Sequence, residues 1–297
     1  MTTSGVVGTV AELWRFPVKS MTGEQVDHVD ITAQGIVGDR AYALVDSLSG
    51  KVVSAKSLKL FPGILDCRAS FVEPPWLDHP VPPVRIVLPN GDTVTSGTAE
   101  ADRALSAHFG REVTLAKAAP PDFTIDQYHP DIEDADPAGH RDTVVEAKLG
   151  AAFFAEAGQP SPVPAGAFFD LFPATVMTTS TLRKLSALHK EGRFDPRRFR
   201  MNVIVATETP GFVENGWVGH DLAVGDAVRL KVTMPDPRCV MTTLAQDDLP
   251  DDTDVLRTLV RYNRLQVGTA GRFPCAGVYA VIDSPGTLRL GDPVTLL

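Results

Sequence analysis

Residues 222–228 read LAVGDAV and residues 288–294 read LRLGDPV, so both segments share the pattern L-x-[VL]-G-D-x-V. In each, apolar residues flank a Gly-Asp pair, which is typical of a strand that reaches a tight turn. Seven residues are too few for the repeating unit of a solenoid. We therefore expect the two segments to be recurrent turns in a β-barrel.

The rest of the chain favours the same architecture. Short runs of strand-forming residues are expected at 6–16, 26–32, 41–46, 51–55, 64–72, 84–88, 173–177, 201–206, 227–234 and 276–282. Asn90-Gly91 supplies the positive φ angles of a tight hairpin turn. This spacing predicts a mainly β fold with inserted helices (α+β), built as two β-barrel-like domains.

Three helices are expected between these strands. One covers 99–109, with Thr98 as N-cap and Gly110 as terminator. A second covers 179–189, and a third runs to Leu265 from a cap at residue 252 or 253.

The middle of the chain changes in composition. Residues 117–166 are rich in Pro, Ala, Gly and acids, which favours a linker. We predict an N-terminal domain at 1–118, an acidic linker at 119–165 and a second domain at 166–297. His129 and His140 lie among the acids of the linker. We interpret this stretch as a solvated loop rather than a metal site, because no helix or metal-ligand spacing holds the two imidazoles on one face.

Charge and composition exclude several classes of function. The chain has 297 residues and a net charge of −9, which argues against nucleic acid or an anionic membrane as a bulk partner. Apolar runs are far shorter than a bilayer span, and the first residues lack a basic leader, so we expect a cytoplasmic location. Three widely spaced cysteines form neither a disulfide framework nor the four-cysteine set of an iron–sulfur cluster.

Cys239 is the cysteine with the most reactive surroundings. It ends the segment Pro235-Asp236-Pro237-Arg238-Cys239, whose prolines should end the preceding strand near Met234 and stiffen the loop. Arg238 would stabilise a thiolate, the form that attacks electrophiles and binds soft metals. The alternative is an inert core thiol. We expect that second role for Cys67, within a strand, and for Cys275, at the start of an apolar run.

Two further features could bind an anion. Arg193, Arg197, Arg198 and Arg200 fall close together in an acidic chain and could either hold phosphate or pair with surface acids. Thr178, Thr179 and Ser180 stand at a helix start, where they could bind phosphate or only cap the helix.

Five segments in order resemble one known family. They are residues 17–20 (PVKS), 38–40 (GDR), 199–202 (FRMN), 238–243 (RCVMTT) and 286–294, which ends in GDPV. Together they resemble the MOSC superfamily, which is named after the C-terminal module of molybdenum cofactor sulfurase. In the proteins that they resemble, an N-terminal MOSC β-barrel domain precedes this module. The subgroup they resemble is that of the mitochondrial amidoxime reducing component and its bacterial relatives. Met201 and Pro237 depart from that pattern, where proline and a small polar residue are usual.

The resemblance implies a molybdenum cofactor, in which a metal is held by a molybdopterin. Cys239 then matches the catalytic residue that supplies a sulfur ligand to molybdenum. The residues that the resemblance assigns to the pterin and its phosphate are Lys19, Ser20, Arg40, Arg200 and Asn202, with Arg238 beside the metal ligand and Thr178, Thr179 and Ser180 at the helix start.

The implied activity is the reduction of a small N-oxygenated (N-hydroxylated) substrate. Electrons would come from a separate protein, such as a ferredoxin, a flavoprotein or a b-type cytochrome, because this chain has no iron–sulfur cluster. An alternative is a sulfur-transfer or cofactor-carrier module with a persulfide on Cys239. A cysteine hydrolase would need an imidazole near Cys239, and none of the seven histidines lies in a hydrolase-like motif.

Overall fold

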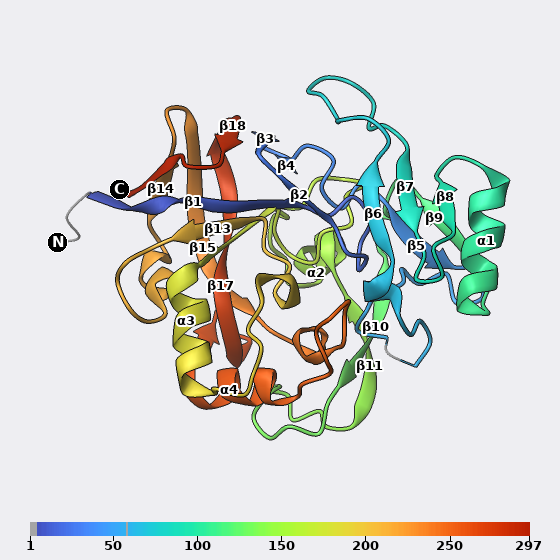
Figure 1. The fold of residues 1–297 in the computed structure, drawn as a ribbon. Coiled ribbons are helices and arrows are strands. Elements are labelled where there is room, and N and C mark those ends of the chain that lie inside the picture. The colour runs from blue at the N-terminus through green and yellow to red at the C-terminus, as the bar shows by residue number, and fades with distance from the viewer. Residues whose placement is uncertain (1–4, 58) are drawn as a thin grey trace.

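The computed structural model describes residues 5–57 and 59–297, and its centre is a closed seven-stranded barrel (Figure 1). Around the barrel the strands follow the order β12 (Ala174–Thr178), β13 (Val203–Ala206), β1 (Gly5–Arg15), β19 (Pro293–Leu296), β14 (Asp221–Val224), β15 (Val228–Pro237) and β17 (Gly271–Ser284). Pairing of β17 with β12, at Val176 opposite Val278, closes the ring. Only the β12–β13 pair is parallel among these strands of the described chain.

Strand β1 belongs to the barrel although it comes from the start of the chain. It pairs with β13 on one side and with β19 on the other, and Figure 1 shows this blue strand beside the red C-terminal segment. The first strand thus lies among strands from the predicted second domain, 166–297. The domain boundaries proposed from the sequence stay a prediction.

The barrel interior is filled by the alternating apolar side chains of its strands. Leu13, Val176, Leu230 and Val278 are each at most 1% exposed, as period-two alternation requires for strands with one buried face. The two Gly-Asp segments connect β14 to β15 and β18 (Gly286–Arg289) to β19. The first is a turn between two barrel strands, as expected, whereas the second leads from the small sheet of β18 into the barrel. Gly225 N of the first turn donates to Pro293 O, which follows the second turn (2.9 Å).

A second hydrophobic core lies beside the barrel and is built from the first third of the chain. Its elements are β5 (Ala43–Asp46), β6 (Arg68–Phe71), β7 (Val84–Val87), β8 (Thr93–Thr95), α1 (Ala99–Phe109) and β9 (Val113–Ala116). Helix α1 has the predicted limits: Thr98 Oγ1 accepts from Ala101 N (3.2 Å), and Gly110 is left-handed. The strand expected at 51–55 is reduced to a single bridge between Val45 and Val52.

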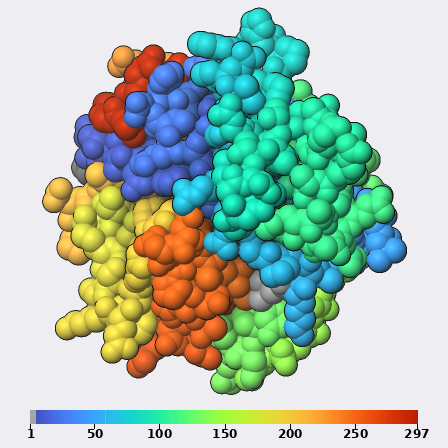
Figure 2. Space-filling view, turned by 45° about the vertical axis from the view of Figure 1, so that its right-hand side comes forward, coloured from blue at the N-terminus to red at the C-terminus, as the bar shows by residue number. Residues whose placement is uncertain are grey.

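Smaller sheets pack their apolar side chains, such as Ile31 and Leu288, into the barrel core. β2 (Glu24–Val26) extends β1, while β3 (His28–Thr32), β4 (Gly35–Ile36) and β18 form a three-stranded sheet. In the space-filling view, residues from the first third of the chain, in blue and cyan, lie against the orange segment near residue 250 (Figure 2). A salt bridge between Arg68 and Asp247 joins these segments.

The acidic middle of the chain has regular structure. Residues Thr124–His129 (β10) and Thr143–Lys148 (β11) form a hairpin, and α2 (Gly150–Glu156) follows. The hairpin forms because its apolar side chains have a surface to cover: Ile125 is fully buried and packs in a small core with Ala43 and Phe168. Composition alone, which suggested a solvated stretch, does not reveal this partner.

Helices α3 (Thr179–Leu188) and α4 (Asp254–Tyr262) pack together on the barrel through Leu185, Leu259 and Ile204. α4 stops short of the expected Leu265 because β16 (Arg264–Val267) pairs with β17. The predicted mainly β fold with inserted helices is confirmed. In the described part of the chain, no helix combines the length and apolar character needed to cross a bilayer.

Candidate active site

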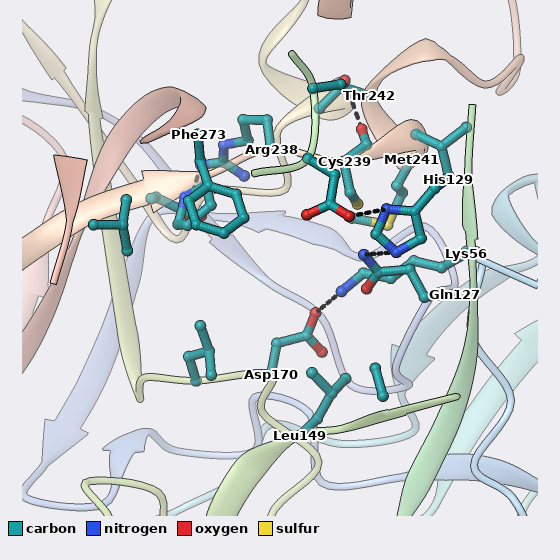
Figure 3. Close-up of a pocket in the computed structure, with 18 of the residues that line it drawn as sticks. Lys56, Gln127, His129, Leu149, Asp170, Arg238, Cys239, Met241, Thr242 and Phe273 are labelled. Carbon is teal, nitrogen blue, oxygen red and sulfur yellow. Dashed lines mark hydrogen bonds and ion pairs between the residues drawn. The ribbon is translucent and has the colours of Figure 1, made fainter. Parts of the chain in front are cut away.

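Cys239 opens into a cavity at the end of β15. The sequence predicted that this strand ends near Met234. It instead continues through both prolines to Pro237. It can do so because β15 there pairs with β17 alone and its register shifts between Pro235 and Pro237, so both prolines lie at an irregular, one-sided part of the sheet, where proline is tolerated. Cys239 is half-buried and lines a cavity of about 290 Å³ (Figure 3).

The other two cysteines are core residues. Cys67 and Cys275 are each 0% exposed, and burial raises the pKa of each thiol to about 12. Cys67 lies between a 3-10 turn, Ile64–Asp66, and β6 rather than inside a strand. Both thiols are therefore held neutral at physiological pH, as expected for inert cysteines.

Arg238 fastens the segment before Cys239 to the barrel. Its Nε donates to Ala276 O (2.8 Å), its Nη1 donates to Phe199 O (2.8 Å), and its Nη2 pairs with Asp236 Oδ2 (2.5 Å). Burial, opposed by Arg238, raises the pKa of Asp236 to about 6. Arg238 thus holds the loop in place and leaves the sulfur accessible.

The segment after Cys239 is fixed by another arginine. A 3-10 turn, Val240–Thr243, follows the cysteine, and Thr242 Oγ1 donates back to Cys239 O (3.0 Å). The fully buried Arg198 donates to Thr242 O (3.3 Å) and Leu244 O (3.1 Å). Cys239 is therefore held from both sides, which is the preorganisation that a ligand or nucleophile needs.

A second, narrower pocket adjoins the cavity. Both are lined by Lys56, Asp170, Asp236, Arg238 and Tyr279, so they share one wall. The residues predicted from the sequence that line this pocket are Lys19, Ser20, Arg40, Arg200, Asn202 and Arg238. The structure therefore brings these six positions together with Cys239, from both ends of the sequence.

Arg40 and Arg200 meet over one aromatic ring. Their guanidinium carbons lie 4.5 Å and 4.3 Å from the centroid of Phe16, and Arg40 Nη2 donates to Arg200 O (3.0 Å). Ser20, Arg40 and Arg200 all have positive φ values, of 66°, 48° and 53°. Non-glycine residues adopt this conformation at a cost, and such strain gathers at functional sites.

The pocket has a surplus of positive charge. Its wall includes five cationic side chains and two carboxylates, Asp170 and Asp236. Arg200 is 6% exposed, and burial together with Arg40 lowers its pKa to about 9. Within the described residues, no carboxylate lies within salt-bridge distance of Arg200. An anion in this pocket would supply the missing counter-charge.

Two charged residues of this wall were missed by sequence reasoning. Asp170 bridges Lys19 and Lys56, with Lys56 Nζ 2.9 Å from Asp170 Oδ2. Burial raises the pKa of Asp170, but the two ammonium groups outweigh it and keep the pKa below its ordinary value. Asp170 follows the buried pair Phe168-Phe169, and an acid beside such an apolar run is a signal that could have been noted.

Asn202 is fixed by its neighbours at the base of the pocket. Its side chain accepts from Thr175 Oγ1 (2.9 Å) and donates to Asp39 Oδ2 (3.0 Å). Asp39 also pairs with Arg40 and accepts from Phe16 N (2.7 Å). The carboxylate of Asp39 thus ties Arg40, Phe16 and Asn202 into one unit.

The helix-start hydroxyls are not brought to this pocket. Thr178 caps α3 by accepting from Thr181 N (3.2 Å) and donates to Glu214 Oε2 (2.7 Å). Ser180 Oγ donates to Thr209 O (2.5 Å), and Thr179 Oγ1 accepts from Thr207 N (3.2 Å). None of the three lines either pocket, and their assignment to a cofactor stays a prediction.

Two histidines, His129 and His140, line the cavity with Cys239. His129 lines it from the end of β10, but its Nδ1 faces Asp136 and its Nε2 faces Gln127 (Figure 3). Across the described residues, no hydrogen bond to Cys239 Sγ is formed. Cys239 therefore lacks the contact with an imidazole by which a hydrolase base activates its nucleophile.

The side chains present fit a group that is both anionic and able to bind a soft sulfur ligand. An accessible thiol stands beside buried cations that lack full counter-charge. Guanidinium and ammonium groups suit phosphate oxygens, and a thiolate suits a soft metal centre. The site therefore has the donor set that a phosphorylated, metal-bearing cofactor requires.

Comparison with known proteins gives two domain matches. Residues 7–71 match the MOSC N-terminal beta barrel domain, and residues 167–295 match the MOSC domain. Human mitochondrial amidoxime-reducing component 1 is 25% identical over 98% of this chain and 83% of its own length. Human mitochondrial amidoxime reducing component 2 is 26% identical over 97% of this chain and 83% of its length. The crystal structure of the YUAD protein from Bacillus subtilis aligns with a TM-score of 0.44 at 12% identity, covering 99% of this chain and 98% of that one.

Proposed function

Because the chain carries a MOSC N-terminal barrel domain and a MOSC domain, we propose that it is a molybdenum-cofactor-dependent oxidoreductase. Its substrate would be a small N-hydroxylated compound, and its electrons would come from a separate donor protein. The named relatives are amidoxime-reducing components, which supports this reaction class.

One observation carries the proposal: Cys239 Sγ opens into a cavity that shares a wall with a pocket of buried, incompletely balanced cations. A cysteine hydrolase would need a basic side chain hydrogen-bonded to the Cys239 sulfur. An inert thiol would be fully buried, as that of Cys67 is. Neither description fits Cys239.

The residues divide the work of holding the cofactor. Cys239 would bind molybdenum as a thiolate, and Arg40 and Arg200 would bind the phosphate beside Phe16. Lys19 stays oriented by Asp170 and by Phe168 O, to which its Nζ donates at 2.9 Å. Arg198 and Arg238 would only position the loop, because backbone carbonyls and, for Arg238, the Asp236 carboxylate already use their donors. When bound, the cofactor supplies a metal that exchanges two electrons.

The reaction balances with two electrons and two protons. An N-hydroxylated substrate R–NH–OH accepts both, the N–O bond breaks, and the products are R–NH₂ and water. The donor protein, which we propose is a ferredoxin, a flavoprotein or a b-type cytochrome, supplies the electrons, and solvent supplies the protons. Part of the same proposal is that the protein works in the cytoplasm and binds neither nucleic acid nor membrane.

The test measures cofactor content and activity together. The full chain is purified from a host grown with molybdate, and molybdenum, pterin and reduction of an amidoxime by a chemically reduced dye are measured. We expect near-equimolar molybdenum in the wild type and its loss in Cys239→Ala. Cys67→Ala, the same change at a core thiol, should keep it.

Two outcomes would contradict the proposal. A folded Cys239→Ala variant that retains molybdenum would remove the ligand assignment. Wild-type protein that carries cyanide-releasable sulfur on Cys239, with no molybdenum and no reductase activity, would instead support sulfur transfer or cofactor carriage.

A further inference from the structure

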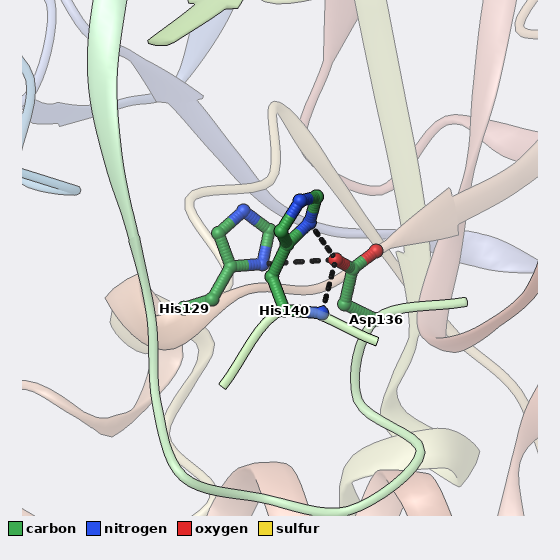
Figure 4. A group of neighbouring side chains, drawn as sticks. All are labelled: His129, Asp136 and His140. Carbon is green, nitrogen blue, oxygen red and sulfur yellow. Dashed lines mark hydrogen bonds and ion pairs between the residues drawn. The ribbon is translucent and has the colours of Figure 1, made fainter. Parts of the chain in front are cut away.

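The turn that joins β10 to β11 gathers two imidazoles around one carboxylate (Figure 4). His140 Nδ1 lies 2.6 Å and His129 Nδ1 lies 3.5 Å from the same oxygen, Asp136 Oδ2. One ligand atom from each of the three residues lies within 4.8 Å of the others. Three potential metal ligands therefore converge on one point.

The turn is held in place by contacts that do not involve the imidazoles. Asp136 accepts from the backbone N–H groups of Ala138 (3.2 Å) and His140 (3.3 Å). Asp134 pairs with Arg264 of β16 at 2.7 Å, so the turn is tied to the barrel. The three ligands are thus ordered before any ion arrives, which reduces the entropy lost on binding.

Charge argues against a simple ion-pair cluster. The single carboxylate of Asp136 can balance the charge of only one protonated imidazole. Two imidazole rings, whose centroids lie 5.1 Å apart, nevertheless face this carboxylate. Two neutral imidazoles and a carboxylate are a common ligand set for zinc and other divalent transition metals.

The surroundings also resemble those of a metal ligand. Gln127 Nε2 lies 3.3 Å from His129 Nε2, and the amide could turn its oxygen to accept from that nitrogen. Metal-bound histidines usually hold their second nitrogen in this way. The three residues also line the cavity into which Cys239 opens, so a free coordination position would face a space large enough for a small molecule.

We propose that His129, Asp136 and His140 form a binding site for a divalent transition-metal ion, with Zn²⁺ as the preferred occupant. The site lies in the wall of the Cys239 cavity but uses none of the residues assigned to the molybdenum cofactor. An ion there would fix the β10–β11 hairpin over the cavity. The proposal is independent of the proposed reductase activity.

The test uses the full chain stripped of metal with a chelator. Zn²⁺ binding is measured by calorimetry, and Co²⁺ serves as a spectroscopic probe of ligand geometry. We expect one equivalent of Zn²⁺ in the wild type. His140→Ala and Asp136→Asn should each weaken binding at least about 100-fold, more than the loss of a supporting partner costs. The His140 side chain is 41% exposed and the Asp136 side chain is 11% exposed, and circular dichroism checks that the variants fold.

Three controls locate the ion. His28→Ala changes an exposed histidine elsewhere, and Cys239→Ser removes the thiol of the cavity. His189→Ala disrupts a second group, His189, Asp252 and Asp254, whose ligand atoms also lie close together. All three variants should bind Zn²⁺ as the wild type does. Absence of binding in the wild type, or loss of binding in Cys239→Ser or His189→Ala with retention in His140→Ala, would overturn the proposal.

Discussion

Arg198 and Arg200 stand two positions apart and are both buried, yet their surroundings differ in kind. Arg198 points into the protein interior, where its guanidinium donates to the backbone carbonyls of Arg193, Thr242, Leu244 and Pro250. Arg200 points into the pocket, where it donates to Met21 O (2.7 Å), lies over Phe16 and faces Arg40. One arginine has its donors used by the fold, and the other retains unused charge.

The difference shows what distinguishes a structural arginine from a ligand-binding one. Burial is similar at 0% and 6% exposure, so burial alone does not tell them apart. The number of protein acceptors around the guanidinium does, because an unsatisfied buried cation costs free energy that only an anion can recover. Four substitutions test this distinction, in order of expected effect.

Arg198→Ala should give the largest loss of stability. The substitution opens a cavity and leaves several buried carbonyls without hydrogen-bond donors. We therefore expect the free energy of unfolding to fall by about 4 kcal/mol. Urea unfolding of the purified chain measures this. A loss below about 1 kcal/mol would show that these hydrogen bonds do not hold the segment after Cys239.

Arg200→Met should give the largest loss of ligand with little loss of stability. The buried charge is costly, so its replacement by an apolar chain should leave the melting temperature nearly unchanged or raise it. Cofactor content should fall at least about tenfold, since a hydrogen bond to a charged group is worth roughly 1.5–3 kcal/mol. Arg193→Met, which changes an exposed arginine of the same segment, is the matched control and should retain the cofactor. Equal loss in both variants would contradict the distinction.

Asp46 and Arg111 provide a balanced pair for reference. Arg111 Nε and Nη2 each lie 2.8 Å from a carboxylate oxygen, and this contact lowers the pKa of Asp46 to about 2. Because the folded pKa lies below the unfolded one, the stabilisation is present above about pH 4 and is lost as the pH falls through about 2. Asp46→Asn should cost about 2 kcal/mol at pH 7, and the difference from the wild type should shrink between pH 4 and pH 2 in acid-unfolding curves. A difference that stays constant over that range would contradict the assignment.

Arg193→Ala should have the smallest effect. Its ion pair with Asp248 joins side chains that are 49% and 60% exposed. Exposed pairs of this kind contribute about 0.5 kcal/mol or less, so thermal unfolding should shift by no more than about a degree or two. A shift comparable with that of Arg198→Ala would mean that the two arginines act as one unit.

Local signals in the sequence predict local structure well here. Helix α1 begins and ends as expected because Thr98 and Gly110 act on neighbouring residues. The partner of β1 could not be predicted, because β13 and β19 lie about 200 and 290 residues further along the chain. The same limit explains the β10–β11 hairpin, whose buried face packs against Phe168.

Residues of the candidate site that belong to sequence motifs could be predicted, whereas those that only the fold places there were missed. Cys239, Arg40 and Arg200 stand in recognisable segments, and the structure brings them to two adjoining pockets that share a wall. Asp170, Lys56 and His129 stand in unremarkable segments and reach these pockets only through the fold. The hydroxyls of residues 178–180 bond to Glu214 and to the 207–209 loop, partners remote in sequence that no local pattern reveals, and their assignment to a cofactor stays a prediction.

The position of β1 between β13 and β19 also sets the order in which the molecule can be made. During synthesis, β2 can pair early with Leu13–Arg15 on one edge of this strand, but the Gly5–Thr9 part of that edge has no neighbour until residue 296 has been translated. Unpaired strand edges promote aggregation. Nascent chains stalled before β19 should therefore be chaperone-dependent, and joining β19 to β1 through a short loop, with new ends elsewhere, should speed refolding.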